Sequence, residues 1–461
     1  MSDQRQNNQY QLAFLLDEGS EASGSAAEGT EALGAERATE SPAGNQQVME
    51  AVCERENLRE ALQRVKANKG SPGIDGMTVE QLPDYLEQHW PAMREQLLSG
   101  TYQPQPVKRV EIPKPDGGVR KLGIPTVLDR FVQQAVQQVL QRQWDPTFSE
   151  HSYGFRPKRS AQQAVAQAQP YMAEGFTWCV DLDLEKFFDR VNHDKLMGRI
   201  AQRVEDKRLL KLIRAFLNAG VMEEGLVSPS VEGTPKGGPL SPLLSNLVLD
   251  ELDRELEARG HRFVRYADDC NIYVRSERAG QRVMESVKRF LSQKLKLKVN
   301  EAKSAVAKPQ ERKFLGFSFL VTPGKEPKRR IAPKAVNRFK ERVREITRKA
   351  KGTRMEQMIQ ELSRYLRGWR GYFSFCETPS VLDALDSWVR RRVRRAFWWQ
   401  WKTGRKRLAE LLRLGASPDL AARIAGSPCG PWRASATPAL HQALSNAYLA
   451  SLGLVSVAAG R

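Results

Sequence analysis

The sequence predicts an α+β fold, on three observations. Short apolar or alternating runs of strand length recur between residues 107 and 320. Longer segments with helical periodicity separate these runs. Beyond residue 333 the pattern is helical and strongly basic. Hydrophobic residues make up 40% of the 461 residues, so most of the chain can bury a core.

The first part of the chain is expected to hold helices and a hairpin. Apolar residues at helical spacing predict helices over 46–68, 79–99 and 129–144. Strands are expected at 107–112 and 119–122, around the turn Pro115-Asp116-Gly117-Gly118. An Asp-Gly pair between alternating runs is a strong hairpin signal, so these two strands should pair with each other.

The middle of the chain is expected to alternate strands and helices. Residues 178–183 predict a strand with Trp178, Val180 and Leu182 on one face and Asp181 and Asp183 on the other. Further strands are expected at 262–266, 271–274, 296–299 and 313–320. Helices are expected at 187–204, 207–219, 243–259, 280–295 and, in pieces, over 333–402.

The charge of the chain is large and unevenly placed. Its formal net charge is +19, which suits an anionic partner. Residues 1–50 hold 2 basic and 9 acidic residues, whereas residues 328–407 hold 24 basic and 7 acidic residues. Residues 1–45 are poor in large apolar groups, so they predict an acidic disordered tail. The basic block contains Trp388, Trp398, Trp399 and Trp401, a mixture that suits nucleic acid better than a merely solvated face.

Several classes of protein are disfavoured. No stretch of about 18 apolar residues is present, so no membrane span is expected. The first 45 residues lack the pattern of a secretory signal. Five well-separated cysteines form no C-x-x-C pair, which argues against a zinc site and a disulfide framework and fits a reducing cytoplasm.

The sharpest local feature is a pair of carboxylates at the tip of an apolar hairpin. Asp268 and Asp269 repel each other there unless a cation lies between them. Asp183, on a neighbouring strand, would complete a set of hard oxygen ligands for Mg²⁺. Two such ions can activate a hydroxyl and stabilise leaving pyrophosphate, as nucleotidyl transfer requires. An Asp-Asp pair alone is common in turns, so the surrounding motifs decide.

Those motifs resemble the reverse transcriptases encoded by bacterial group II introns. Tyr266-Ala267-Asp268-Asp269 resembles their Y-x-D-D box, and 183–189 (DLEKFFD) resembles the box that opens their palm. Residues 233–242 (GTPKGGPLSP) resemble a loop of this subgroup. Three shorter motifs fit in the same order: 123–130 with Gly-Ile-Pro-Thr and Asp-Arg, 153–157 (YGFRP) and 313–317 (KFLGF). The resemblance runs from about residue 49 to 402.

The resemblance implies a right-hand polymerase with fingers, an antiparallel palm sheet and a helical thumb or maturase domain. Residues 46–330 would form fingers and palm, with an N-terminal extension over about 46–100. Residues 331–407 would form the basic thumb, and 408–461 a short C-terminal segment that binds DNA. The tail after residue 402 has one His and one Cys, so no HNH nuclease site is expected; this resembles class C introns.

Site residues are carried over one by one. Asp183, Asp268 and Asp269 would bind two Mg²⁺ ions together with the Leu184 carbonyl. Asp183 is preferred to Asp181 because only Asp183 matches the motif. Phe188 would be the steric gate that selects deoxynucleotides; otherwise it is a core aromatic. The remaining nucleotide contacts would be Lys114, Arg120, Lys236 and Lys303.

Each of those four cations has an open question. Lys114 and Arg120 flank the hairpin turn and could equally be solvated. Lys303 resembles a lysine proposed to protonate leaving pyrophosphate. Lys236 departs from the family, which usually has Gln beside the nucleotide. A lysine there adds charge near the triphosphate, and it could alter nucleotide binding, fidelity or rate.

Primer and RNA contacts are expected from two regions. Residues 314–317 would hold the primer end, through Phe314, Leu315 and Gly316. Residues 366–373 (LRGWRGYF) resemble the R-G-W-x-x-Y-F signature of the thumb. The expected contacts there and in the following helix are Arg367, Trp369, Arg390, Arg391 and Arg394.

The leading interpretation is an RNA-directed DNA polymerase and splicing maturase in a cytoplasmic nucleoprotein particle. Its expected partners are group II intron RNA, an RNA template with a DNA primer, dNTPs and target DNA. Two alternatives stay open: an RNA-binding maturase whose polymerase fold is a relic, and a domesticated reverse transcriptase acting in DNA repair or phage defence. Other reverse transcriptase branches fit less well, and the sequence leaves monomer or dimer undecided.

Overall fold

The structure is a computed structural model that describes residues 47–113, 119–223, 226–228, 233, 237–322, 324–348 and 354–458. The chain folds into two compact units that alternate along the sequence. Unit 1 comprises the described residues of 1–159, 182–270 and 281–305. Unit 2 comprises those of 160–181, 271–280 and 306–461. The expected tail, 1–45, lies outside the described residues, and the expected domain boundaries stay a prediction.

Helices form most of unit 1. They are α2 (Val48–Val52), α3 (Arg55–Asn68), α4 (Leu82–Ser99), α5 (Val127–Trp144), α7 (Phe187–Arg190), α8 (His193–Ala201), α9 (Lys207–Asn218) and α10 (Ser241–Ala258). A short 3₁₀ turn, η3 (Asp145–Thr147), follows α5. The expected single helix over 187–204 is wrong, because Val191 and Asn192 are extended and the Asn192 side chain caps α8.

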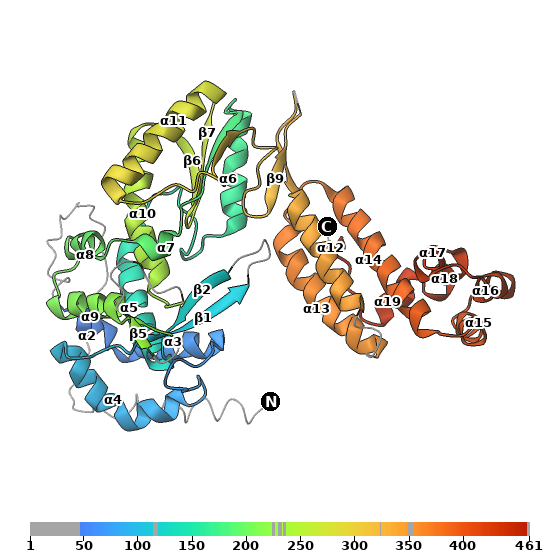
Figure 1. Ribbon diagram of the computed structural model, residues 1–461, viewed down its shortest axis with the longest axis horizontal. Coiled ribbons are helices and arrows are strands. Elements are labelled where there is room, and N and C mark those ends of the chain that lie inside the picture. Colours follow the sequence, from blue (N-terminus) through green and yellow to red (C-terminus); the bar gives the residue numbers. More distant parts are fainter. Residues whose placement is uncertain are drawn as a thin grey trace, which may run out of the picture. The chain divides into compact units, whose positions relative to one another are not determined.

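A four-stranded sheet in unit 1 contains the predicted hairpin (Figure 1). Its order is β2 (Val119–Ile124), β1 (Val107–Pro113), β4 (Val221–Glu223) and β5 (Leu226–Ser228). β1 and β2 pair antiparallel from Lys108 opposite Ile124 to Pro113 opposite Val119. The expected hairpin is therefore confirmed, and β4 extends the sheet in parallel with β1.

A second sheet carries the candidate carboxylates. Its order is β6 (Arg262–Tyr266), β7 (Asp269–Val274), β3 (Trp178–Leu182) and β8 (Ala305–Ala307). Unit 1 takes the last residue of β3 and the first two residues of β7, so these two strand ends lie in the same compact unit. The expected alternation in β3 holds only in part, because Cys179 is buried as well as Val180 and Leu182. The expected strand at 296–299 is reduced to one bridge, between Val299 and Leu184.

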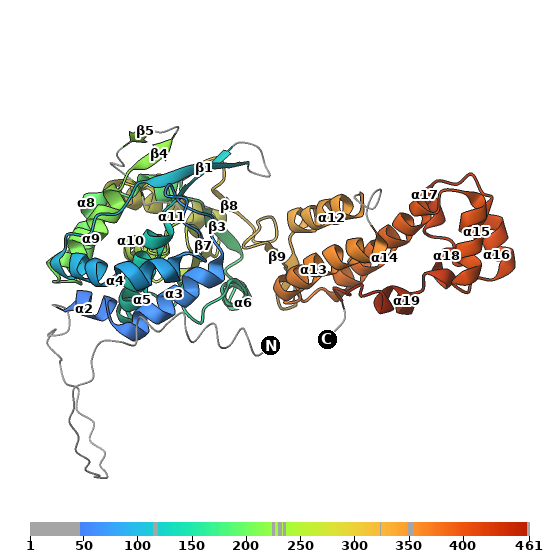
Figure 2. The same ribbon diagram turned by 90° about the horizontal axis from the view of Figure 1, so that it is seen from below.

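Unit 2 contains a bundle of long amphipathic helices. Its elements up to residue 400 are α6 (Ala161–Ala173), β9 (Phe317–Leu320), β10 (Lys328–Ile331), α12 (Pro333–Arg348), α13 (Met355–Phe373) and α14 (Pro379–Gln400). α11 (Glu277–Phe290) begins in the unit 2 segment that ends at Gly280; the rest of α11 and the π-helical turn that follows it, η4 (Leu291–Leu295), belong to unit 1. Figure 2 shows α12, α13 and α14 running side by side. The Phe339, Trp369 and Phe373 rings pack between them, with centroids 4.4 and 4.7 Å apart.

Short helices complete unit 2. They are α15 (Gly404–Arg413), α16 (Pro418–Ala425), α17 (Pro431–Ala434), α18 (Pro438–Ala443) and α19 (Asn446–Ser451). α15 begins with a glycine and α16, α17 and α18 begin with a proline, residues that mark breaks between helices, whereas α19 begins at Asn446 after the cap residue Ser445. The expected α+β class is confirmed. None of the described helices is long and apolar enough to span a bilayer.

Candidate active site

The two adjacent carboxylates lie on a tight turn between paired strands. β6 ends at Tyr266 and β7 begins at Asp269, so only Ala267 and Asp268 connect them. Two-residue connections join antiparallel neighbours, so β6 and β7 form a hairpin. Ala267 has φ +56°, a left-handed conformation that costs a non-glycine residue about 1–2 kcal/mol. Asp268 is half-buried and Asp269 exposed.

A buried arginine fixes this turn. Arg265 is 1% exposed, and its five N–H donors all meet acceptors. Two donors form a fork with the Asp253 carboxylate on α10, which is also fully buried. The others reach Asn246 Oδ1 at 3.1 Å, Ser152 Oγ at 2.8 Å and the Ala267 carbonyl at 2.9 Å. The left-handed turn residue is therefore held directly by a fully satisfied guanidinium.

The electrostatics of this clamp follow from its geometry. Burial alone would lower the pKa of Arg265, but the Asp253 carboxylate outweighs burial, and the pKa is raised. The ionised pair is retained because the remaining donors also find partners. Removing either partner would leave an uncompensated charge beneath the turn.

The loop 149–159 supports the same turn from the side. The Tyr153 N–H donates to the Arg265 carbonyl and the Arg265 N–H donates to the His151 carbonyl, both at 2.9 Å. A Cβ on Gly154 would lie 2.3 Å from the Ala267 nitrogen, so only glycine allows this approach. The Gly154 carbonyl accepts from Asn246 Nδ2 at 2.8 Å, which links the loop to the Arg265 clamp.

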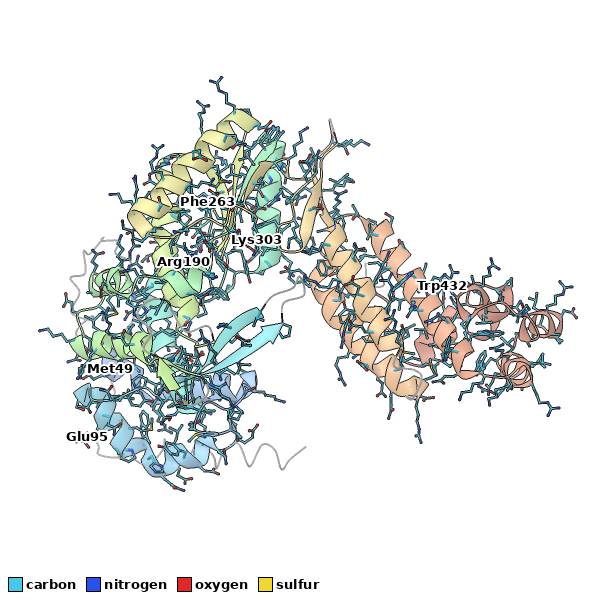
Figure 3. The ribbon with its side chains drawn as sticks, viewed as in Figure 1. Met49, Glu95, Arg190, Phe263, Lys303 and Trp432 are labelled. Atoms are coloured by element: carbon cyan, nitrogen blue, oxygen red, sulfur yellow. The ribbon has the colours of Figure 1, made fainter. Side chains whose placement is uncertain are left out.

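Asp183 follows directly after β3 and is tied to the segment 298–304. Its N–H donates to Ser304 Oγ at 2.9 Å, and its carbonyl accepts from the Asn300 N–H at 2.8 Å. Its carboxylate lies 3.6 Å from the ammonium of Lys303, which Figure 3 labels. The Lys303 side chain is 59% exposed, so it can move away from Asp183 at little energetic cost.

The backbone pairing here leaves the Leu184 carbonyl outside the ladder. Leu184 faces Val299 in an isolated antiparallel bridge. The hydrogen bonds of this bridge come from its neighbours: Glu185 N–H to Lys298 carbonyl, and Asn300 N–H to Asp183 carbonyl. In such a non-hydrogen-bonded pair, the N–H and carbonyl groups of the two facing residues, Leu184 and Val299, do not bond to each other. The Leu184 carbonyl is thus consistent with the ligand role expected for it.

The donor chemistry fits a hard divalent cation, but the described side chains do not form a ready cage. Asp183, Asp268 and Asp269 all belong to unit 1, at neighbouring strand ends of one sheet. Carboxylates plus a carbonyl are the ligands that such a cation prefers. Within the described ranges, no three His, Cys, Asp or Glu side chains lie close enough to hold a metal.

Asp181 differs from Asp183 in its partner. Its carboxylate lies 2.7 Å from the guanidinium of Arg312, in unit 2. Arg312 Nε also donates to it at 2.8 Å. This well-formed ion pair gives Asp181 a structural role, which supports the preference for Asp183.

Phe188 lies beside the glycine-rich loop. It is half-buried at the start of α7, with its ring 5.3 Å from the ring of Phe187. Gly233 has φ +94°, and a Cβ there would lie 2.8 Å from the Phe188 carbonyl. A Cβ on Gly237 would lie 2.6 Å from the Gly123 carbonyl. Gly233 and Gly237 therefore let the backbone approach Phe188 and β2 more closely than a residue with a Cβ could.

Three of the expected nucleotide contacts cannot be placed. Lys114 and Lys236 lie outside the described residues, and so does the side chain of Arg120. The Arg120 backbone lies in β2, opposite Ile112. Their roles stay predictions.

The expected primer-holding segment forms a tight turn in unit 2. Phe314 and Phe317 exchange two backbone hydrogen bonds, of 2.8 and 2.9 Å, and both rings are buried. Leu315 and Gly316 form the tip, with φ +51° and +83°. Tyr372 Oη donates to the Leu315 carbonyl at 2.8 Å. Only the tip, Leu315 and Gly316, is accessible to a primer, whereas Phe314 anchors it.

The arginines expected to contact RNA divide into two groups. Arg367 is exposed, and Arg390 and Arg391 are half-buried. Arg390 lies 3.6 Å from Asp386, and Arg391 stacks 4.0 Å from the ring centroid of Trp432, which Figure 3 labels. These side chains remain partly open to solvent and can bind phosphate.

Two expected RNA contacts are corrected by their burial. Arg394 is buried and donates to the Leu444 carbonyl and to Asn446 Oδ1, both at 2.9 Å. It braces α14 against the short C-terminal helices. Trp369 is buried against Phe339 in the bundle core. Neither side chain is available to RNA in this structure.

The structure adds a cationic cluster that the sequence did not single out. Lys340, Arg344 and Arg392 lie 5.6–5.9 Å from the Trp388 ring centroid. Burial and the positive charges of Arg395, Arg344 and Arg348 lower the pKa of Arg392 to about 10. Arg392 donates to Thr347 Oγ1 at 2.7 Å. The concentration of positive charge on α12 and α14 favours a phosphate backbone.

Sequence reasoning also missed the residues that support the turn carrying Asp268 and Asp269. Arg265, Asp253 and Gly154 were not assigned a role. Arg265 immediately precedes the Tyr266 motif, which was a usable signal, but Asp253 gives no local sign of its pairing. A contact between α10 and β6 is required to see it.

Comparison with known proteins shows the family. The profile "Reverse transcriptase (RNA-dependent DNA polymerase)" matches residues 112–319, and "Group II intron, maturase-specific domain" matches 336–413. Protein YkfC of Escherichia coli (strain K12) is 33% identical over 315 residues, which cover 60% of this chain and 82% of YkfC. Group II intron-encoded protein LtrA of Lactococcus lactis subsp. cremoris is 30% identical over 327 residues.

The matched lengths differ between these relatives. The LtrA match covers 57% of this chain and 54% of LtrA, so the chain spans about half of that relative. Among solved structures, a "Partial Cas6-RT-Cas1--Cas2 complex" matches 54% of this chain and 43% of its own, with 24% identity and a TM-score of 0.35. The two domain profiles and the YkfC match together show that the chain belongs to the family of group II intron-encoded proteins, which join a reverse transcriptase domain to a maturase-specific domain.

Proposed function

We propose that this protein is the RNA-directed DNA polymerase and maturase of a group II intron, and that Asp183, Asp268 and Asp269 carry its polymerase chemistry. The observation that supports this most is the Asp268-Asp269 turn, which unit 1 holds in a costly left-handed conformation by a buried arginine and a glycine contact. Strain maintained by so many contacts is typical of a functional site.

The carboxylates and the Leu184 carbonyl would hold two Mg²⁺ ions. When bound, such ions activate the primer 3′-hydroxyl and stabilise the leaving pyrophosphate. The clamp around Arg265 keeps Asp268 in place before substrate arrives. Lys303, whose ammonium lies 3.6 Å from the Asp183 carboxylate, would donate a proton to the leaving pyrophosphate. Phe188 would exclude a 2′-hydroxyl from the sugar site.

The maturase role would belong to the basic helices of unit 2. The helices α12, α13 and α14 bury their apolar residues in the bundle and keep some arginines at the surface. These are the exposed Arg344 and Arg367 and the half-buried Arg391. Contacts from such side chains to phosphates would hold intron RNA without reading its bases. The protein would then assist splicing and copy the intron RNA at a DNA target, as part of a nucleoprotein particle in the bacterial cytoplasm.

A pair of neighbouring carboxylates offers a matched test of the polymerase assignment. Asp181 and Asp183 lie two residues apart, but Asp181 forms an ion pair with Arg312. Primer extension on an RNA template with Mg²⁺ should be lost in Asp183→Asn. It should be largely retained in Asp181→Asn, where the amide can still accept from Arg312. Equal activity of Asp183→Asn and the native chain would contradict the assignment.

A further inference from the structure

Phe155 is exposed in a place where a large apolar ring needs an explanation. Its side chain is 47% exposed, and its backbone has φ +58°, in the left-handed region. This conformation costs a non-glycine residue free energy, and about half of the Phe155 surface still remains in water. We propose that Phe155 is a stacking platform for the terminal base pair of the template–primer duplex. This proposal rests on the polymerase function proposed above.

The loop around Phe155 is rigid on both sides. Gly154 packs closely against the turn that carries Asp268 and Asp269: a Cβ added to Gly154 would lie 2.3 Å from the Ala267 nitrogen. Arg156 uses all five N–H donors, on the Asp145 carboxylate and carbonyl and on the Ser149 and Ser152 carbonyls. Phe155 thus cannot relax its backbone without breaking one of these anchors. These anchors therefore hold the Phe155 ring in its exposed position.

The ring lies next to the proposed chemistry. Its centroid is 6.4 Å from that of Tyr266, with a 42° tilt between the rings. Tyr266 is followed two and three positions later by Asp268 and Asp269. An apolar surface of two rings therefore borders the carboxylates that would act on the primer end.

The chemistry of this surface selects a nucleotide as its occupant. A base offers a flat π-face, and stacking on an aromatic side chain tolerates any sequence. A polymerase needs this tolerance, because the terminal pair changes at each step. The proposed ligand is the end of the duplex rather than the incoming nucleotide, because Phe155 adjoins the tyrosine side of the turn.

The test uses the full chain and a binding signal that does not depend on catalysis. An RNA–DNA duplex carries 2-aminopurine, a base whose fluorescence falls on stacking, at the primer terminus. A second duplex carries it eight pairs upstream. Binding is measured without dNTP for the native chain and for Phe155→Ala, Phe155→Gly and Phe155→Tyr. Alanine keeps the backbone cost, glycine relieves it, and tyrosine keeps the ring.

The proposal predicts a terminal fluorescence change in the native and Phe155→Tyr proteins only. Phe155→Ala and Phe155→Gly should both lose it and bind the duplex about fivefold or more weakly, as loss of one stacked base at about 1–3 kcal/mol implies. The upstream probe should respond alike in all four. An unchanged terminal signal in the alanine and glycine variants would overturn the proposal, and so would a rise confined to the KM for dNTP. Because the fluorescence signal does not require primer extension, failure of the stacking proposal can be told apart from failure of the polymerase assignment.

Discussion

Replacing Arg265 by lysine would keep one charge and lose the geometry that fixes the turn carrying Asp268 and Asp269. The five donors of Arg265 meet two oxygens of Asp253, one each of Asn246 and Ser152, and the Ala267 carbonyl. An ammonium has three donors on one atom. At least two of these buried acceptors would then lack a donor.

The size of the effect follows from that count. Each unsatisfied buried polar group costs about 1–3 kcal/mol, so the loss should be about 2–6 kcal/mol. This is a large share of the roughly 5–15 kcal/mol that stabilises a typical domain. Primer extension should fall too, because the turn that carries Asp268 loses its support at the Ala267 carbonyl. Displacing a catalytic group by about 1 Å can cost about a hundredfold in rate.

Hydrogen exchange measures this locally. Arg265→Lys should lower the free energy of local opening by at least about 2 kcal/mol. Amides in the peptide covering 262–270 should therefore exchange about 30-fold or more faster than in the native chain. The peptide covering 355–373, in unit 2, is the internal control and should not change. Arg64→Lys is the matched control variant, because Arg64 forms an exposed pair with Glu60 and such pairs contribute little. Unchanged exchange in 262–270, or full primer extension, would refute the reasoning.

Three further predictions concern single side chains in unit 1. Gly154→Ala should reduce primer extension at least tenfold, because its Cβ would collide with the backbone at Ala267, whereas Gly198→Ala, which meets nothing within 4 Å, should not. Phe188→Ala should raise incorporation of ribonucleotides relative to deoxynucleotides in single-nucleotide extension; an unchanged ratio would make Phe188 a core aromatic. Burial lowers the pKa of His151 from its ordinary 6.5, so its contribution to stability should be complete above about pH 6.5 and decline below it. Exchange in 262–270 should therefore accelerate on acidification, after correction for intrinsic rates, and His151→Gln should weaken that dependence.

The basic helices give a prediction about salt. Arg344 is exposed beside Trp388 and lies in the cationic cluster of α12 and α14. If it contacts a phosphate, Arg344→Gln should lower the slope of log affinity against log salt by about 0.7–0.9. RNA affinity measured from about 50 to about 300 mM salt gives this slope for each variant. Arg394→Gln should leave the slope unchanged, because Arg394 is buried against Leu444 and Asn446.

The sequence was sufficient where a pattern is local. The hairpin of β1 and β2 followed from an Asp-Gly turn between alternating runs, and the structure has it in register. Apolar periodicity predicted α4 and α5, but it predicted α2 and α3 as a single helix over 46–68, which the structure breaks at Cys53 and Glu54. α3 and α4 each bury one face, whereas the buried residues of α5 lie on nearly all sides of the helix. The carboxylates of the turn stood out because charge at the tip of an apolar hairpin is costly.

The sequence was insufficient where a role depends on distant partners. Arg394 and Trp369 belong to a basic, aromatic pattern typical of RNA binding, yet their neighbours bury them in the protein. The break before α8 depends on the cap formed by Asn192, which a continuous apolar periodicity conceals. The pairing of Arg265 with Asp253 joins α10 to β6, and neither residue signals the other.

The most direct test compares the native chain with Asp268→Ala on a poly(rA)/oligo(dT) template with Mg²⁺. Primer extension and equilibrium RNA binding are measured on the same preparations. The account predicts extension by the native chain, none by Asp268→Ala, and equal RNA binding by both. Extension by Asp268→Ala at the native rate would contradict the assignment of the turn. Absence of extension from both proteins, with tight RNA binding retained, would contradict the polymerase function and leave the maturase.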